Sequence, residues 1–102
     1  MDRIATFQKF IERSPKDPFP RYGLAMEYKS QQRFAEADAA FAELIASFPD
    51  YVASYLQAGE VKTKLGLVDD AKEILRRGIA AASAKGDGHA KKEIEAALAE
   101  LG

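Results

Sequence analysis

The sequence predicts an all-α fold, and three observations carry the prediction. Apolar residues recur at three- and four-residue steps, so that Phe34, Phe41 and Leu44 fall on one stripe of a helix. No segment alternates apolar with polar residues for long enough to indicate a half-buried strand. The chain also resembles itself at a spacing of 34 residues, which is typical of stacked structural repeats. The expected architecture is therefore an α-solenoid of antiparallel helix pairs with six helices.

Prolines mark two boundaries between helices, the one after the first helix and the one after the third. The segment Ser14–Pro20 holds three of the chain's four prolines, and a helix cannot pass through it because proline lacks an N–H group. The first helix is therefore expected to end near Arg13, and Asp17 is the expected cap of the second. Pro49 closes the third helix in the same way, and Asp50 is the expected cap of the fourth.

Glycines mark two further boundaries between helices, the one after the fourth helix and the one after the fifth. Gly66 is expected in the turn into the fifth helix, and the segment Lys85–Gly88 separates that helix from the last. Inside the fifth helix Gly78 costs about 1 kcal/mol relative to alanine, so we expect the last helix to approach closely there. Lys62 stands at an apolar position of the fourth helix, with its stem expected along the core and its ammonium group in water. The expected helices span residues 2–13, 18–31, 34–48, 51–65, 69–84 and 88–101.

A shift of 34 residues aligns the first, third and fifth helices with one another. It places Phe7 on Phe41, Phe41 on Leu75, and Pro15 on Pro49. Elsewhere in the alignment small residues meet small ones, and bulky residues mostly meet bulky ones. One packing unit is therefore used repeatedly, and each unit must bury its face against its neighbours.

Residues 18–51 resemble the tetratricopeptide repeat, a 34-residue helix–turn–helix unit. The matching residues of this unit are Leu24, Ala25, Tyr28, Ala37, Phe41 and Pro49. Those of the next unit are Tyr55, Ala58, Gly59, Ala71 and Leu75. The departures are Arg21 in place of a large aromatic residue, Lys62 in place of tyrosine and Ser83 in place of proline.

The resemblance implies one domain over residues 1–102. It divides the chain into a half repeat at 1–15, repeats at 18–51 and 52–85, and a capping helix at 88–101.

The two ends of the stack differ. In the last helix Lys92 and Glu93 stand where a further unit would have its small packing pair, so growth of the stack stops there. The apolar stripe of that helix is expected on the fifth helix or its neighbour, and consists of Ala90, Ile94, Ala97, Leu98 and Leu101. At the other end the bulky residues Ile4, Phe7 and Ile11, with Phe10, have only one neighbouring helix to cover them. This edge is a candidate dimer interface.

In the resembled family the first helices of successive units line a concave groove that receives an extended peptide or a helix. The corresponding candidates here are Phe19, Tyr22, Met26, Lys29, Ala53, Leu56, Glu60 and Lys64. Plain packing against neighbouring helices is the alternative for Tyr22 and Met26. It is the preferred interpretation for Phe19, which sits among prolines.

The resemblance implies a protein–protein interaction module without catalysis. Some family members hold a partner's terminal carboxylate with lysine, arginine and asparagine, but this chain has no asparagine, and Lys29 and Lys64 alone do not make such a clamp. A groove of aromatic, methionine and few charged groups suits an amphipathic helix or an apolar peptide segment better. The alternative is a self-associating structural protein, a homodimer through the N-terminal edge.

Composition argues against several other classes. A net charge of -1 is unlike that of a dedicated nucleic-acid binder. With no cysteine and with His89 as its one histidine, the chain offers no thiol chemistry and no catalytic triad, so we expect no cofactor and no metal. The longest stretch without a charged residue, 51–59, is far shorter than the ~20 residues of a membrane span. With no secretory signal after Met1, a cytoplasmic location is expected.

Overall fold

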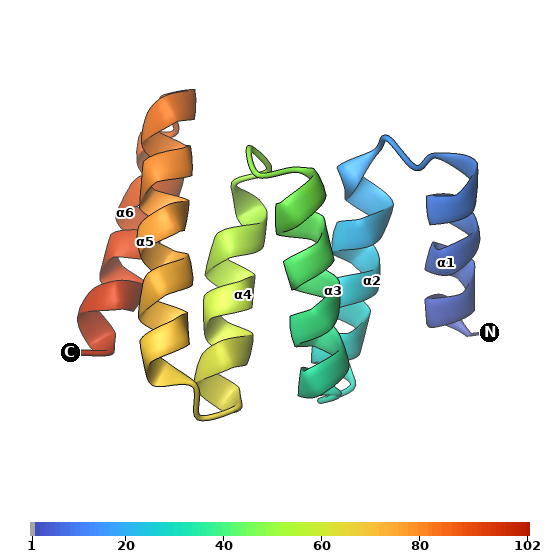
Figure 1. Cartoon of the computed structure of the whole chain (residues 1–102), viewed down its shortest axis with the longest axis horizontal. Coiled ribbons are helices and arrows are strands. Elements are labelled where there is room, and N and C mark those ends of the chain that lie inside the picture. Colours follow the sequence, from blue (N-terminus) through green and yellow to red (C-terminus); the bar gives the residue numbers. More distant parts are fainter. Residues whose placement is uncertain (1) are drawn as a thin grey trace.

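The computed structural model describes residues 2–102 and contains six α-helices joined by short turns (Figure 1). No strand occurs within these residues. The helix ends lie within two residues of the sequence prediction. The helices are α1 (Arg3–Arg13), α2 (Pro18–Ser30), α3 (Phe34–Ser47), α4 (Ala53–Lys64), α5 (Val68–Lys85) and α6 (Gly88–Glu100).

Aspartates cap three of the helices. Asp17 accepts a hydrogen bond from the backbone N–H of Phe19 at 3.0 Å, as predicted, and Asp2 and Asp87 cap α1 and α6 in the same way. The prediction that Asp50 caps α4 was wrong. Val52 precedes the first turn of α4 and makes no side-chain cap.

The start of α4 is fixed instead by Tyr55. Its hydroxyl donates a hydrogen bond to the backbone carbonyl of Pro49 at 2.5 Å, which ties the first turn of α4 to the end of the preceding turn. The N–H of Tyr51 donates to the carbonyl of Phe48 at 3.0 Å and closes that turn. The backbone at residues 48–52 is thus held by contacts that need no acidic cap.

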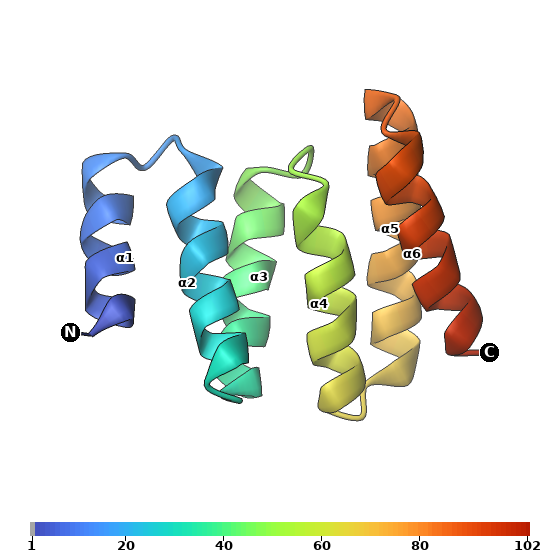
Figure 2. The same cartoon turned by 180° about the vertical axis from the view of Figure 1, so that it is seen from behind.

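Consecutive helices pack against each other, and the chain forms a row from α1 to α6 (Figure 1). Beyond these neighbours, α4 contacts both α2 and α6. The reverse view shows α2, α4 and α6 on the same side of the row (Figure 2). We call this side the α2–α4–α6 face. Helix α1 packs against α2 alone among the described helices.

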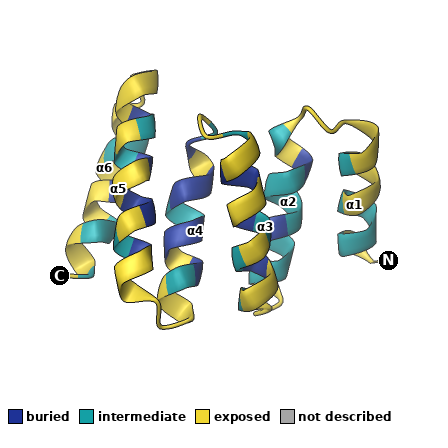
Figure 3. Cartoon of the chain, viewed as in Figure 1, coloured by how far each residue is buried: buried dark blue, intermediate teal, exposed yellow. Residues whose placement is uncertain are grey.

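The core lies between α2 and α6, and α1 contributes no buried residue to it (Figure 3). Small residues such as Ala25 and Ala37 are fully buried where α2 and α3 meet, and they let the two helices approach closely. Phe41 and Leu75 fill the layers between the helices, as expected from the repeat. Ile94 is the buried residue of α6, and the rest of its apolar stripe packs onto the same core.

Two expectations about single residues need correction. Gly78 lies closest to Tyr55 of α4, and Ile94 of the last helix is the more distant contact. The ammonium group of Lys62 does not simply extend into water. It forms an ion pair with Asp38 of α3 at 3.0 Å, so it links two repeats.

Candidate protein-binding face

Three hollows lie along the α2–α4–α6 face. The N-terminal pocket, of about 500 Å³, lies between α1 and α2. The middle pocket, of about 320 Å³, lies among α2, α4 and α6. The C-terminal pocket, of about 260 Å³, is lined by residues of α2, α4, α5 and α6 and by Leu101. Because Tyr22 lines both the N-terminal and the middle pocket, these two form a continuous surface.

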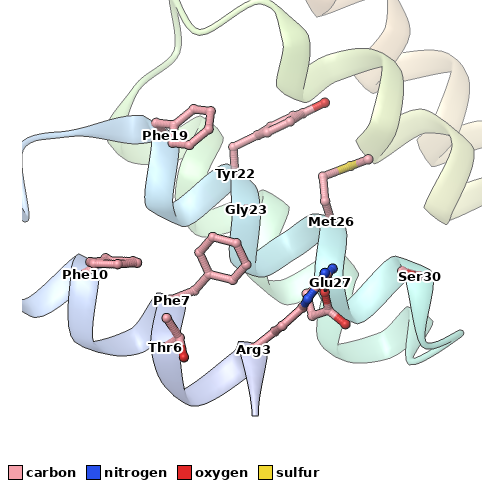
Figure 4. A pocket seen from close by; sticks show the side chains of 10 residues that line it. All are labelled: Arg3, Thr6, Phe7, Phe10, Phe19, Tyr22, Gly23, Met26, Glu27 and Ser30. Carbon is pink, nitrogen blue, oxygen red and sulfur yellow. Dashed lines mark ion pairs between the residues drawn. The ribbon is translucent and has the colours of Figure 1, made fainter. Parts of the chain in front are cut away.

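Four aromatic residues and Met26 give the N-terminal pocket a mainly apolar lining (Figure 4). The ring of Phe7 rests on Gly23, where a Cβ would lie 2.7 Å from the Cζ atom of Phe7. A larger residue at position 23 would therefore displace the ring of Phe7 from this position. Phe10 and Phe19 leave 46% and 64% of their surface exposed, so the pocket carries apolar surface that no part of the described chain covers.

One ion pair stands at the other end of this pocket. The guanidinium of Arg3 lies 3.6 Å from a carboxylate oxygen of Glu27, and both residues line the pocket (Figure 4). The side chain of Arg3 remains 77% exposed. The charge at this end is therefore balanced but accessible.

Tyr22 joins the pockets to the core. Its ring packs edge-on against Phe41 at 6.3 Å and lies 5.5 Å from the ring of Tyr51. Burial raises the pKa of the Tyr22 phenol, and the neighbouring Tyr51 and Glu60 raise it further. Tyr22 is therefore a packing residue that also lines the pockets, and its predicted role in binding a partner stays a prediction.

The middle pocket is lined by α4 and the start of α6. Ala53 and Leu56 of α4 supply its apolar side, and Ile94 contributes from the core. His89 and Glu93 lie on the α6 side, with the His89 Nε2 atom 3.1 Å from a carboxylate oxygen of Glu93. The α6 side of the middle pocket is therefore more polar than the lining of the N-terminal pocket.

The C-terminal pocket contains the charged candidates Lys29, Glu60 and Lys64. The ammonium group of Lys29 donates to Gln57 at 2.5 Å and to the Glu60 carboxylate. Lys29 and Glu60 therefore link α2 to α4. Of the two lysines, Lys64 is therefore the more accessible cation.

The eight groove candidates thus fall into three adjacent hollows. Phe19, Tyr22 and Met26 line the N-terminal pocket, and Ala53 and Leu56 line the middle one. The packing interpretation of Phe19 was wrong, because its ring is mostly exposed. The assignment of a binding role to these residues remains a prediction.

The candidate dimer edge is only partly a separate surface. Phe7 belongs to the N-terminal pocket, whereas Ile4 and Ile11 are half-buried outside the pockets. The sequence pattern places Phe10 at the uncovered N-terminal edge but not in the groove, and it assigns His89 to neither surface. The equivalence of Phe10 with the core residue Leu44 is the signal that an apolar residue at this place needs a covering partner.

The described residues offer neither of two other kinds of site. Within residues 2–102 no group of three His, Asp or Glu side chains is placed to hold a metal ion. None of the helices in this part of the chain is long and apolar enough to span a membrane.

The comparisons with known proteins agree with the geometry. The sequence profile of the tetratricopeptide repeat matches residues 28–101. The chain belongs to the tetratricopeptide repeat family. Members of this family are in general protein–protein interaction modules and not catalysts. No curated protein matches the sequence.

Solved tetratricopeptide repeat structures are similar over most of the chain. A domain from Salinibacter ruber, solved by NMR, is 34% identical with a TM-score of 0.80, and the match covers 85% of this chain and 88% of that one. The crystal structure of a Salinibacter ruber tetratricopeptide repeat domain gives 34% identity, a TM-score of 0.79 and coverage of 83% and 96%. The TPR2B domain of yeast Sti1, in complex with pHsp70, is 19% identical with a TM-score of 0.89 and coverage of 96% and 78%. The predicted tetratricopeptide repeat solenoid is confirmed.

Proposed function

We propose that the chain is an adaptor that binds an apolar peptide or amphipathic helix of a partner protein on its α2–α4–α6 face, without catalysis. The observation that carries the proposal is the continuity of the N-terminal and middle pockets at Tyr22. Exposed Phe10 and Phe19 lie at one end of this surface, and Leu56 lies at the other. Adjoining apolar hollows with few charges suit a segment with several apolar side chains.

The charges favour an apolar ligand over an acidic one. Lys29, a cation of the C-terminal pocket, already contacts Glu60 and Gln57. A ligand carboxylate would have to displace these partners, at a cost in free energy. The yeast Sti1 domain, solved in complex with pHsp70, supports the idea that this fold accommodates a segment of another protein. We propose a cytoplasmic location, because a chain without cysteine suits a reducing compartment.

The experiment is partner capture by site-specific photo-crosslinking in cells. A photo-reactive residue at position 53, in the middle pocket, is expected to crosslink one partner protein. The same residue at position 39, which is exposed on α3, is the matched control and should not. Replacing Tyr22 and Leu56 together by alanine should abolish the crosslink while helical content by circular dichroism stays unchanged. If the double variant unfolds, these side chains serve the core and the site assignment is wrong.

A second candidate function is self-association through Ile4, Phe7 and Ile11. The observation in its favour is that α1 has no buried residue and a single neighbouring helix. Size-exclusion chromatography with light scattering distinguishes the two functions. A dimer that Phe7→Glu dissociates would favour self-association, and a monomer would favour the adaptor.

A further inference from the structure

The 34-residue repeat makes the N-terminal pocket comparable with two covered sites in the same molecule. Phe7 is equivalent to Phe41 and Leu75, which are 0% and 2% exposed. Phe10 is equivalent to Leu44, which is fully buried, yet Phe10 is 46% exposed. Phe7 and Phe10 are thus residues of the type that the repeat buries in its core, but in α1 no helix covers them.

The α1 positions are exposed because one covering helix is missing. In the repeat at 18–51 the first helix, α2, packs on α3 and contacts α4, and in the repeat at 52–85 the first helix, α4, packs on α5 and contacts α6. The pair α1 and α2 has no such covering helix among residues 2–102 (Figure 2). The N-terminal pocket is therefore the continuation of an interface that the chain forms twice within itself.

We propose that the N-terminal pocket binds a single amphipathic helix of a partner protein, which takes the place that α2 and α4 hold in the other units. This inference rests on the proposed protein-binding function, and it names the kind of ligand and its position. Because α2 and α4 run antiparallel to α3 and α5 respectively, the bound helix runs antiparallel to α1 and parallel to α2 (Figure 1).

The internal copies also define the chemistry of the ligand. A Cβ at Gly59 would lie 2.6 Å from the Cδ2 atom of Leu75, so the covering helix needs a small residue opposite this layer. Opposite Phe7, the partner helix therefore carries glycine or alanine. Between α2 and α4, Lys29 contacts Glu60. In the proposed complex α2 takes the part of α4, and its residue equivalent to Glu60 is Met26. The partner helix therefore carries an apolar residue at the position equivalent to Lys29.

Charge complementarity agrees with this orientation. The equivalents of Arg3 are Ala37 and Ala71, which are buried in the first turns of α3 and α5, just after the turns that follow the covering helices α2 and α4. The guanidinium of Arg3, with 77% of its side chain exposed, is thus placed near the C-terminal end of the bound helix, where it keeps Glu27 as a partner and presents its exposed N–H groups to the ligand. The free carbonyl groups and the negative end of the helix dipole lie there, and a cation stabilises both.

A second copy of this chain fits the pocket less well. The helix that a copy could offer in repeat register is α6, the last of the series α2, α4 and α6. Its residues equivalent to Leu24 and Ala25 are Lys92 and Glu93, which are both exposed. Two charged side chains would have to lie against Phe7, which is unfavourable without partners.

The test uses a synthetic peptide as the probe. The peptide copies residues 18–33 with Lys29→Leu, and is titrated into the isotope-labelled full chain while backbone amide signals are followed by NMR. We expect saturable shifts at Thr6, Gly23 and Ser30, which line the pocket, and none at Glu43 on the exposed side of α3. A peptide with Ala25→Leu, which fills the small position, should bind at least about tenfold more weakly, a loss of about 1.4 kcal/mol.

Matched variants of the chain sharpen the test. Phe10→Ala should weaken the binding of the peptide at least about tenfold, whereas Leu67→Ala, with a similarly exposed side chain outside the pocket, should not. Equal affinity for Phe10→Ala and the natural chain would overturn the proposal. A dimer of the natural chain that Phe10→Ala dissociates would also overturn it, because the occupant would then be a second copy.

A short free peptide is only weakly helical in water, so the second experiment joins the helix covalently to the chain. A copy of residues 18–34 with Lys29→Leu placed directly before Met1 preserves the 34-residue spacing. We expect a higher urea midpoint than for the natural chain and no binding of the free peptide. An unchanged midpoint would overturn the proposal. If crosslinks from position 53 persist in that case, the proposed function stands and only this inference fails.

Discussion

Gly78 of α5 lies directly against Tyr55 of α4, where a Cβ atom at position 78 would come within 2.5 Å of the Tyr55 Cβ. The Cδ1 atom of Ile94 would be 3.2 Å away on the other side. Three helices therefore meet at one glycine. The Tyr55 Cβ is fixed to the backbone, so α4 and α5 would have to separate to admit any side chain.

We predict that Gly78→Ala destabilises the fold. Alanine improves helix propensity by about 1 kcal/mol, but overpacking of this kind costs typically about 1–3 kcal/mol. The expected free energy of unfolding is therefore lower by up to about 2 kcal/mol, measured by urea denaturation. Gly88→Ala is the control, because nothing lies within 4 Å of a Cβ there. Equal stability of the two variants would show that α4 and α5 can separate without loss.

The turns between paired helices supply a second prediction. Gln32 has a φ of 60°, in the left-handed region, and its repeat equivalent Gly66 has a φ of 78°. A residue with a Cβ is disfavoured there by about 1–2 kcal/mol. Gln32→Gly is therefore expected to raise the free energy of unfolding by about 0.5–1 kcal/mol after the entropy of glycine in the unfolded chain is counted. Gly66→Gln should lower it, and thermal denaturation of the pair checks both signs.

Alkaline pH should destabilise the chain through two tyrosines. Burial raises the pKa of Tyr22 and of Tyr55 above the ordinary value, so the folded state favours their protonated forms. This contribution to stability is fully present below about pH 10 and is lost as pH rises through the folded pKa values. Urea denaturation at several pH values from 8 to 11 should show the decline. The double variant Tyr22→Phe, Tyr55→Phe should show a shallower one, and an identical slope would exclude this cause.

The ion pair between Asp38 and Lys62 should contribute to the joining of two repeats. Both side chains are mostly buried, at 27% and 21% exposure, so solvent screens the pair only in part. A double-mutant cycle with Asp38→Ala and Lys62→Ala is expected to give a coupling free energy of about 0.5–1 kcal/mol. The exposed pair His89 and Glu93 is the comparison, with a smaller coupling expected. Additive single effects at positions 38 and 62 would contradict the prediction.

The local signals in the sequence predicted the helices well, because proline and glycine act on the backbone wherever they stand. Pro49 and Gly66 needed no tertiary information to end their helices. Asp50 failed as a cap because the hydroxyl of Tyr55, a residue beyond the turn, fixes the chain there instead. A side-chain hydrogen bond between residues six apart, such as this one, is not predicted by the capping pattern of the sequence.

The candidate face was harder to predict for a physical reason. Helix α2 is apolar on two sides, and periodicity does not say which side has a neighbour. Tyr22 proved to serve both the core and the pockets, whereas Phe19 is almost free of packing. The exposure of Phe10 follows from a missing neighbour and not from its own residue type.

The single attachment of α1 has a consequence for how the molecule opens. A helix with no buried residue and one contacting partner can detach while α2 to α6 stay folded, so the free energy of its local opening is a small part of the total. A ligand in the N-terminal pocket would also contact α1 and so make this local opening rarer. Binding would therefore slow the hydrogen exchange of the backbone amides of residues 3–13.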